Sequence, residues 1–276
     1  MLDNNNNVIS TGAGNGDRSG HSTYHALVLK MERRVNNGIY LQGSYVWSKL
    51  LSDTDRVDAG GRAMDQYNRR WEKSVGEFDL PHNFKFSHIY DLPWGKGQKW
   101  DLGTAGNLAL GGWHFSAIHV YTSGQPIQLT GGGIGLGGRS AAVVKSLDNW
   151  VVDIPDNPNI RAASGYTSYF ATLCSIAANC NAAGTAVVTQ PTVFGQAPRF
   201  NGRARRMANL GENASLQKSF YFTEKVKMDF RWEVFNVFNR VVFGAPNSNI
   251  TSTTFGRITS QFNSPRQMQF GLKLYF

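Results

Sequence analysis

Few residues in the sequence have the types and spacing that catalysis or metal binding needs. The six histidines form no His-Glu-x-x-His pair, and we find no Gly-x-Ser-x-Gly motif and no nucleophile–base set. Cys174 and Cys180 lie six positions apart with no histidine nearby, which is poor spacing for zinc. They fit either a local disulfide formed outside the cytoplasm or two free thiols. The sequence therefore predicts that the protein is not an enzyme and uses no metal or cofactor.

Two further motifs suggest ligands at first sight. Gly133 begins a Gly-x-Gly-x-x-Gly pattern with Arg139 at the lysine position of a P-loop, but five glycines between 131 and 137 exceed what a phosphate cradle uses. The acidic run 53–58 suggests calcium, yet Val57 and Met64 occupy positions where an EF-type loop places ligands. Surface loops explain both stretches better.

Composition is unusual for a soluble domain and offers no transmembrane helix. Of 276 residues, 28 are Lys or Arg and 19 are Asp or Glu, so the net charge is +9. Charged residues make up only 17%, whereas aromatic residues make up 12% and glycine occurs 30 times. The mean hydropathy of −0.34 comes with no apolar run of about 18 residues, which excludes a transmembrane helix. The first residues lack the features of a signal peptide, so export would need an upstream start.

Alternation of apolar and polar residues is the dominant pattern. In 226–238, Met228, Phe230 and Trp232 alternate with Lys227, Asp229 and other charged residues, as in a strand with one buried and one polar face. Similar alternation predicts seven antiparallel strands in 24–34, 38–49, 82–93, 113–122, 213–222, 226–238 and 268–276. In 113–122 the two faces are ambiguous, since His119 shares a face with Phe115 and Tyr121.

The connections between these strands alternate in length. Residues 35–37 and 223–225 are tight turns and 95–97 begin a moderately short one, whereas about 51–79, 127–211 and 240–264 are long. Strands of about 9–11 residues, short turns on one side and long loops on the other are typical of outer-membrane β-barrels. Aromatic residues near the strand ends fit the interfacial girdles of such barrels: Trp47, Trp94, Trp100, Trp113, Tyr121, Tyr221 and Tyr275. A soluble β-sandwich or lipocalin-like barrel is the alternative.

The strand count predicts an incomplete barrel. Bacterial single-chain barrels have an even number of strands, and lipid forbids open sheet edges. Either an eighth strand lies within 130–211 or 254–260, or the chain is the C-terminal part of a larger barrel. We expect residues 1–23 to form a flexible extracellular tail and 24–276 to form the barrel segment.

Several motifs resemble the C-terminal barrel segment of TonB-dependent outer-membrane receptors, especially the acidobacterial type with an N-terminal carboxypeptidase-regulatory-like domain. The order and spacing of these motifs hold from about 24 to 276. They are Tyr24–Arg34, Gly43–Lys49, Phe78–Phe84, Asp91–Gly97, Gly112–Ser116, Thr122–Pro126, Phe235–Asn239, Phe255–Ser260 and Pro265–Phe276.

The resemblance implies a barrel of roughly 22 strands, of which this chain supplies about a third. It also implies an N-terminal plug domain and a short N-terminal sequence motif, the box, through which the TonB complex delivers energy. This sequence contains neither. The expected function is energised uptake of a ligand across the outer membrane of a Gram-negative bacterium by the complete receptor. The ligand of such a receptor could be a siderophore, an oligosaccharide or a peptide. Two alternative functions for the chain are a stand-alone outer-membrane pore or adhesin and a soluble binding module.

Residue roles follow from this prediction. We expect Lys227, Asp229, Arg231 and Glu233 to face the lumen, and Tyr67, Trp71, Trp150, Tyr166 and Tyr169 to contact ligand. The terminal Phe276, after Phe270, Leu272 and Leu274, resembles the signal read by the barrel-assembly machinery, and such an apolar strand suits β-augmentation.

The remaining partners are lipids. An arginine cluster before the fifth predicted strand lacks the aromatic platform of a nucleic-acid site, and we expect no nucleic-acid partner. In a barrel these arginines suit lipopolysaccharide phosphates equally well; they are Arg199, Arg203, Arg205 and Arg206.

Overall fold

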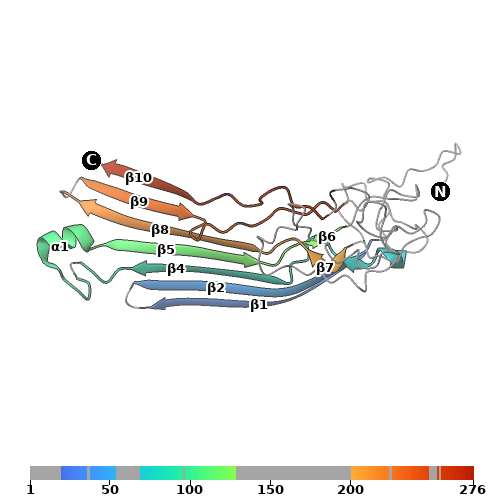
Figure 1. The fold of residues 1–276 in the computed structure, drawn as a ribbon. Helices are drawn as coiled ribbons and strands as arrows, with labels where there is room; N and C mark the ends of the chain where they lie inside the picture. The colour runs from blue at the N-terminus through green and yellow to red at the C-terminus, as the bar shows by residue number, and fades with distance from the viewer. Residues whose placement is uncertain are drawn as a thin grey trace, which may run out of the picture.

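One long antiparallel sheet dominates the computed structural model, which describes residues 20–35, 38–53, 69–95, 97–128, 200–223, 226–248, 254 and 256–276. Its main strands follow one another in chain order without a crossover (Figure 1). Within the described residues, the first and last strands each pair on one side only, so the sheet is open. The strands are β1 (Ser22–Val35), β2 (Ile39–Ser52), β4 (His82–Asp91), β5 (Trp113–Thr122), β8 (Asn209–Tyr221), β9 (Lys227–Phe235) and β10 (Gln267–Tyr275).

All seven strands predicted from alternation are therefore confirmed, with small differences at their ends. β8 begins at Asn209, four residues before the predicted start, so the loop expected over 127–211 ends earlier. β9 ends at Phe235 rather than at residue 238, because Asn236 takes a positive φ of 53° that a strand does not accommodate.

Five short elements escaped the sequence analysis. They are the 3₁₀ helix η2 (Arg69–Glu72), β3 (Ser74–Val75), the helix α1 (Gly103–Leu110), β6 (Pro126–Ile127) and β7 (Asn201–Arg205). Two-residue strands are too short to show alternation, and α1 buries no residue, so neither leaves a periodic pattern. β7 lies in the stretch considered for an eighth strand, but it pairs with β6 outside the main sheet. The other such stretch, 254–260, contains no strand among its described residues.

The two ends of the sheet differ. The β1–β2 and β8–β9 hairpins and α1 lie at one end, and the longer connections lie at the other (Figure 1). We call these the turn end and the loop end. Among the described residues, buried apolar side chains are few and mostly belong to the loop end, where Val75, Ile127, Phe200 and Ala204 pack.

Strand register separates the side chains into two faces, because residues directly opposite each other in neighbouring strands share a face. The row Gly43, Phe86 and His119, for example, runs across β2, β4 and β5. On the apolar face lie Leu27, Leu29, Met31, Tyr45, Trp47, Phe84, Phe86, Tyr90, Phe115, Ala117, Leu216, Phe220, Phe230, Trp232, Phe270, Leu272 and Leu274. On the polar face lie Lys30, Glu32, Gln42, Ser44, Lys85, Ser87, Ser116, Asn213, Ser215, Gln217, Asp229, Arg231, Glu233, Gln269 and Lys273.

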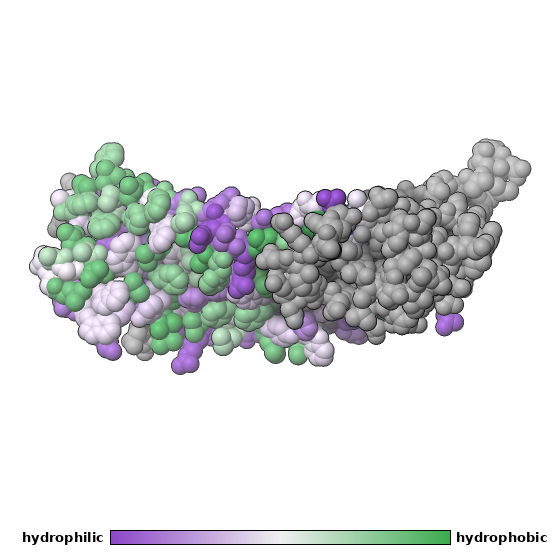
Figure 2. Space-filling model, in the orientation of Figure 1, coloured by the Kyte–Doolittle hydropathy of each residue, from purple (hydrophilic) through white to green (hydrophobic). Residues whose placement is uncertain are grey.

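The apolar face is strongly exposed. Trp47 is 57% exposed, Phe270 70% and Leu272 68%. Figure 2 shows apolar side chains gathered at the end of the sheet that carries α1 and the C-terminus. Exposure on this scale is costly in water and favourable in hydrocarbon. None of the described helices is long and apolar enough to cross a membrane.

Candidate functional site

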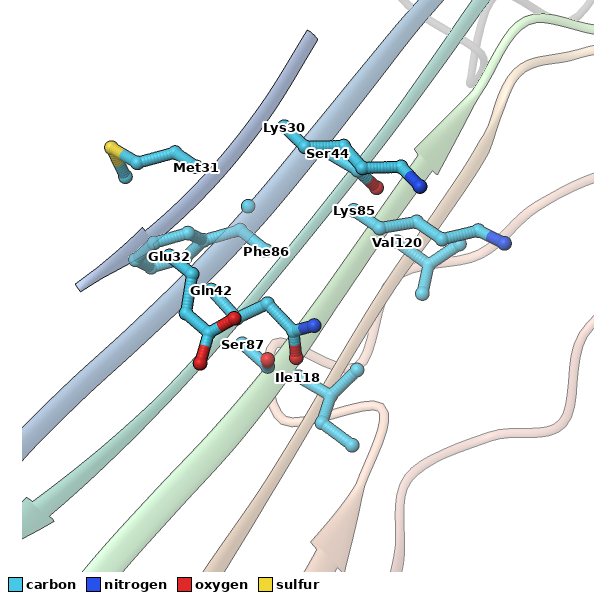
Figure 3. A pocket seen from close by; sticks show the side chains of 11 residues that line it. Lys30, Met31, Glu32, Gln42, Ser44, Lys85, Phe86, Ser87, Ile118 and Val120 are labelled. Atoms are coloured by element: carbon cyan, nitrogen blue, oxygen red, sulfur yellow. The ribbon is translucent and has the colours of Figure 1, made fainter. Parts of the chain in front are cut away.

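A shallow groove of 560 Å³ crosses the polar face over β1, β2, β4 and β5 (Figure 3). Strand register explains its composition, since it aligns two rows of side chains across neighbouring strands. One row is Lys30, Ser44, Lys85 and Val120, and the other is Glu32, Gln42, Ser87 and Ile118.

The groove combines an apolar lining, to which Met31, Phe86, Ile118 and Val120 contribute, with groups that carry charge or form hydrogen bonds. Lys30 and Lys85 stand on either side of Ser44 in the first row, which provides two cations about one hydroxyl. In the second row, Glu32 accepts a hydrogen bond of 3.2 Å from the Tyr40 hydroxyl and lies 3.9 Å from the Arg34 guanidinium. The groove therefore offers charges and hydrogen bonds beside apolar side chains.

A second polar cluster lies on the same face over β8–β10, and it contains the four charged residues predicted to line a lumen. Lys227 lies 3.7 Å from Asp229, and Arg231 lies 3.5 Å from Glu233. Neighbouring strands complete the cluster, because Ser219 donates to Asp229 at 2.7 Å and Gln269 donates to Glu233 at 2.5 Å. Sequence alternation thus placed these residues on one face, and the structure adds their pairing.

The residues predicted as an assembly signal lie on the opposite face. Phe270, Leu272 and Leu274 point to the apolar side of β10, and Phe276 follows that strand with 98% exposure. Phe270 stacks on Trp232 of β9 with ring centroids 6.0 Å apart. The exposed face of β10 that carries these side chains is thus apolar and aromatic.

Most of the predicted ligand-contact residues fall outside the described residues. These are Tyr67, Trp150, Tyr166 and Tyr169, and the same is true of Cys174, Cys180 and the glycine-rich stretch. Trp71 falls in η2. Among the described residues, no group of three or more His, Cys, Asp or Glu side chains could hold a metal ion.

The structure shows a buried ion pair at the loop end that the sequence analysis missed. The Asp79 side chain is fully buried; its carboxylate accepts hydrogen bonds from Arg205 at 2.5 Å and from the Leu50 amide at 2.6 Å. Arg205 also donates to the carbonyls of Asp79, Gly202 and Gly124 at 2.8–3.1 Å. We call Asp79 and Arg205 the loop clamp, since they join β2, β7 and the β5–β6 connection. Arg205 stood out only as part of a basic cluster, and the clamp leaves its side chain 16% exposed.

A second polar knot holds the connection from β9 to β10. Asn236 donates to the carbonyls of Arg240 and Ser264 at 2.9 and 3.0 Å, and its own carbonyl oxygen accepts from the Arg240 amide at 2.8 Å. Arg240 in turn donates to the buried Glu212 of β8 at 2.9 Å. Asn236 belongs to the Phe-Asn-Val-Phe-Asn motif at 235–239, which the sequence analysis used only as a point of family resemblance.

The structure also assigns the strand whose faces were ambiguous. His119 of β5 lies on the apolar face, where its ring stacks on His88 of β4 with centroids 5.5 Å apart. Phe86 and Phe115 pack against this pair. Two imidazoles therefore lie among aromatic rings on this face, and Glu212 of β8 is directly opposite His119.

A sheet with one exposed apolar face, one charged face, short turns and long loops is the wall of an outer-membrane β-barrel, with its turns in the periplasm and its loops outside the cell. Residues 6–269 match the family described as "Outer membrane beta barrel domain". The chain belongs to this family, and it resides in the outer membrane.

Three solved structures align with most of the chain. One is the ferripyoverdine receptor of the outer membrane of Pseudomonas aeruginosa bound to ferripyoverdine, with 9% identity and a TM-score of 0.40 over 92% of this chain. The others are P. aeruginosa FpvA bound to a heterologous pyoverdine and the FpvAI–pyocin S2 complex, each 10% identical over 92% of this chain, with TM-scores of 0.37 and 0.36. The chain spans 19% of the first two proteins and 20% of the third. The comparison with curated proteins gave no match.

Proposed function

We propose that this chain forms part of the barrel wall of a TonB-dependent receptor and takes part in energised uptake of a ligand across the outer membrane. The observation that carries the proposal is an open sheet with one lipid-compatible and one charged face. In lipid, the free backbone groups of β1 and β10 need further strands to pair with, because an open edge costs several kcal/mol per unsatisfied group. Seven strands in series thus suit a sector of a larger barrel.

The polar face supports a lumen role for this sector. Its side chains alternate with the lipid-facing ones on every main strand, as lumen-lining residues do in large barrels. The paired charges Lys227–Asp229 and Arg231–Glu233 carry little net charge, so they suit contact with a plug or a passing solute. The groove beside Lys30 and Lys85 offers cations to an anionic group of the ligand.

The proposal is tested first by the DNA upstream of the Met1 codon. An uninterrupted reading frame that encodes a signal peptide, a plug and further alternating segments supports it. A stop codon directly before Met1 would contradict it and favour a stand-alone pore or adhesin.

Expression of the 276-residue chain alone provides the second test. We expect this chain to run at one position on SDS gels with and without boiling, since an open sheet does not form the SDS-resistant barrel that shifts on heating. A heat-modifiable monomer that conducts ions across a planar bilayer would overturn the proposal. The complete gene product serves as the control, and we expect its band on the SDS gel to shift on boiling.

A further inference from the structure

The connection between β4 and β5 is unlike the others at the turn end. It spans residues 92–112 and contains α1, whereas the β1–β2 and β8–β9 connections are tight turns. We call residues 92–112 the α1 connection. A barrel needs no such length to join two neighbouring antiparallel strands, so this segment calls for a separate explanation.

The α1 connection has a defined internal structure. Trp94 stacks on Trp100 with ring centroids 6.4 Å apart. The Gly95 amide donates to the Trp100 carbonyl at 3.0 Å, and the Asp101 carboxylate accepts from the Asn107 side chain at 2.7 Å. Gly95 and Gly111 approach closely, because a Cβ on Gly111 would lie 2.9 Å from the Gly95 Cα. The segment is thus a folded unit rather than a loose loop.

Two residues of the apolar face hold the C-terminal end of α1. The Lys218 ammonium donates to the carbonyls of Leu108 and Ala109 at 2.5 and 2.9 Å, which satisfies free carbonyls at the negative end of the helix. The Trp113 indole donates to the Ala109 carbonyl at 3.1 Å. Trp113 and Lys218 face each other across β5 and β8 on the apolar face. The helix end therefore rests on the outer, lipid-facing side of the barrel wall.

Several large apolar side chains of the α1 connection are exposed. Leu102 is 43% exposed, Leu108 57%, Leu110 51% and Trp100 47%. No residue of α1 is buried, so the helix covers no core in the described part of the chain. Lys99 places its ammonium 5.2 Å from the centre of the Trp100 ring. Leucines, a tryptophan and a lysine on a short element are the combination that favours a membrane–water interface.

We propose that the α1 connection is an anchor in the periplasmic leaflet of the outer membrane, with Leu102, Leu108 and Leu110 at the boundary between phospholipid headgroups and acyl chains. The occupant is phospholipid, for two reasons. The exposed leucines continue the apolar face of the sheet, which already faces lipid, and Lys99 offers a cation to phospholipid phosphates. The anchor would fix the height of the wall in the bilayer at β4 and β5.

This inference does not depend on the proposed transport function, because a stand-alone barrel of the same family would use the same anchor. Its test therefore measures contact between α1 and lipid, not uptake of a ligand. The photoreactive residue p-benzoylphenylalanine is placed at position 108 in the complete gene product, and cells are irradiated with the protein in its own outer membrane. Position 272 on the apolar face is the positive control, and position 118 in the polar groove is the negative control.

We expect intact-protein mass spectrometry to find phospholipid adducts at positions 108 and 272 and none at 118. A protein adduct at 108, or no adduct there while 272 reacts with lipid, would show that α1 faces a periplasmic partner or water and would overturn the inference. A lipopolysaccharide adduct at 108 would do the same, because it would place α1 in the outer leaflet. Position 110 replaces 108 if heat-modifiability shows that the first variant does not fold.

A second variant tests the attachment of the helix. Lys218→Met keeps the length of the side chain but removes its hydrogen bonds to α1. We expect this change to reduce the lipid adduct at 108 while leaving the adduct at 272 unchanged. An undiminished adduct at 108 would show that Lys218 does not hold the helix against the membrane.

Discussion

Removing the Asp79 carboxylate should open the loop clamp without unfolding the sheet. Asp79→Ala leaves the Arg205 guanidinium, only 16% exposed, without its counter-charge and leaves the Leu50 amide without its acceptor. Removal of one partner of a buried ion pair costs about 3–5 kcal/mol. Lys49, whose ammonium lies 3.8 Å from Asp79, is 49% exposed and contributes little to this cost. We therefore take the cost as set by Arg205 and the amide.

The assay is hydrogen exchange of amides that the clamp holds but that do not bond to Asp79 themselves. The Gly76 amide donates to the Leu50 carbonyl at 3.0 Å, and the Arg206 amide donates to the Gln125 carbonyl at 2.8 Å. When reclosing is faster than exchange, the exchange rate follows the free energy of local opening. A loss of about 3–5 kcal/mol then speeds exchange at these amides by about two to three and a half orders of magnitude, since 1.4 kcal/mol is a factor of ten.

Controls separate the charge from the hydrogen bond. The Leu92 amide, which donates to the Trp113 carbonyl at the turn end, should not change. Asp79→Asn keeps an acceptor for Leu50 and should have a smaller effect than Asp79→Ala. The double variant Asp79→Ala/Arg205→Met should cost less than the sum of the two single changes, because no unpaired charge remains. Unchanged exchange at Gly76 and Arg206 in Asp79→Ala would refute the clamp.

Three further predictions concern the sheet itself. Deleting Phe276 should lower the yield of protein in the outer membrane, measured by blotting of membrane fractions; an unchanged yield would remove its role in assembly. Leu216→Lys on the apolar face should destabilise the complete barrel by up to about 2–4 kcal/mol in urea titrations in lipid vesicles, whereas Ser215→Lys on the polar face should be near neutral; equal costs would contradict the assignment of faces. Asn236→Ala should cost about 1–3 kcal/mol for each buried group it leaves unpaired, in the same titration, and a stability equal to that of the unmodified protein would show that the knot is dispensable.

The strands were predictable because each carries its own evidence. A strand of nine or more residues repeats the alternation four times or more, and one face must stay apolar for lipid while the other stays polar for water. β9 shows this most clearly, with Phe230 and Trp232 on one side and Asp229 and Arg231 on the other. The short turns were predictable for the same reason, since they are what remains between two such patterns.

The clamp and the α1 connection were not predictable because their evidence lies far apart in sequence. Asp79 and Arg205 are 126 positions apart, and Lys218 is about as far from the carbonyls of α1 that it binds. The alternation pattern reports only neighbours two positions away, and α1 adds no helical stripe because it has no buried face. Ligand-contact residues predicted in the long loops, such as Trp150, stay predictions.

Two charged residues on the apolar face of β8 pair with segments outside the sheet. Lys218 and Glu212 both stand among apolar neighbours on β8, where a charge is expensive unless it is paired. The structure pairs each with a connection that leaves the sheet: Lys218 with the end of α1, and Glu212 with Arg240 beyond β9. A charge on the lipid side of a barrel strand therefore points to a segment folded back against the outside of the wall. In the structure, Lys218 opposite Trp113 and the length of 92–112 therefore both support a position of α1 against the outside of the wall.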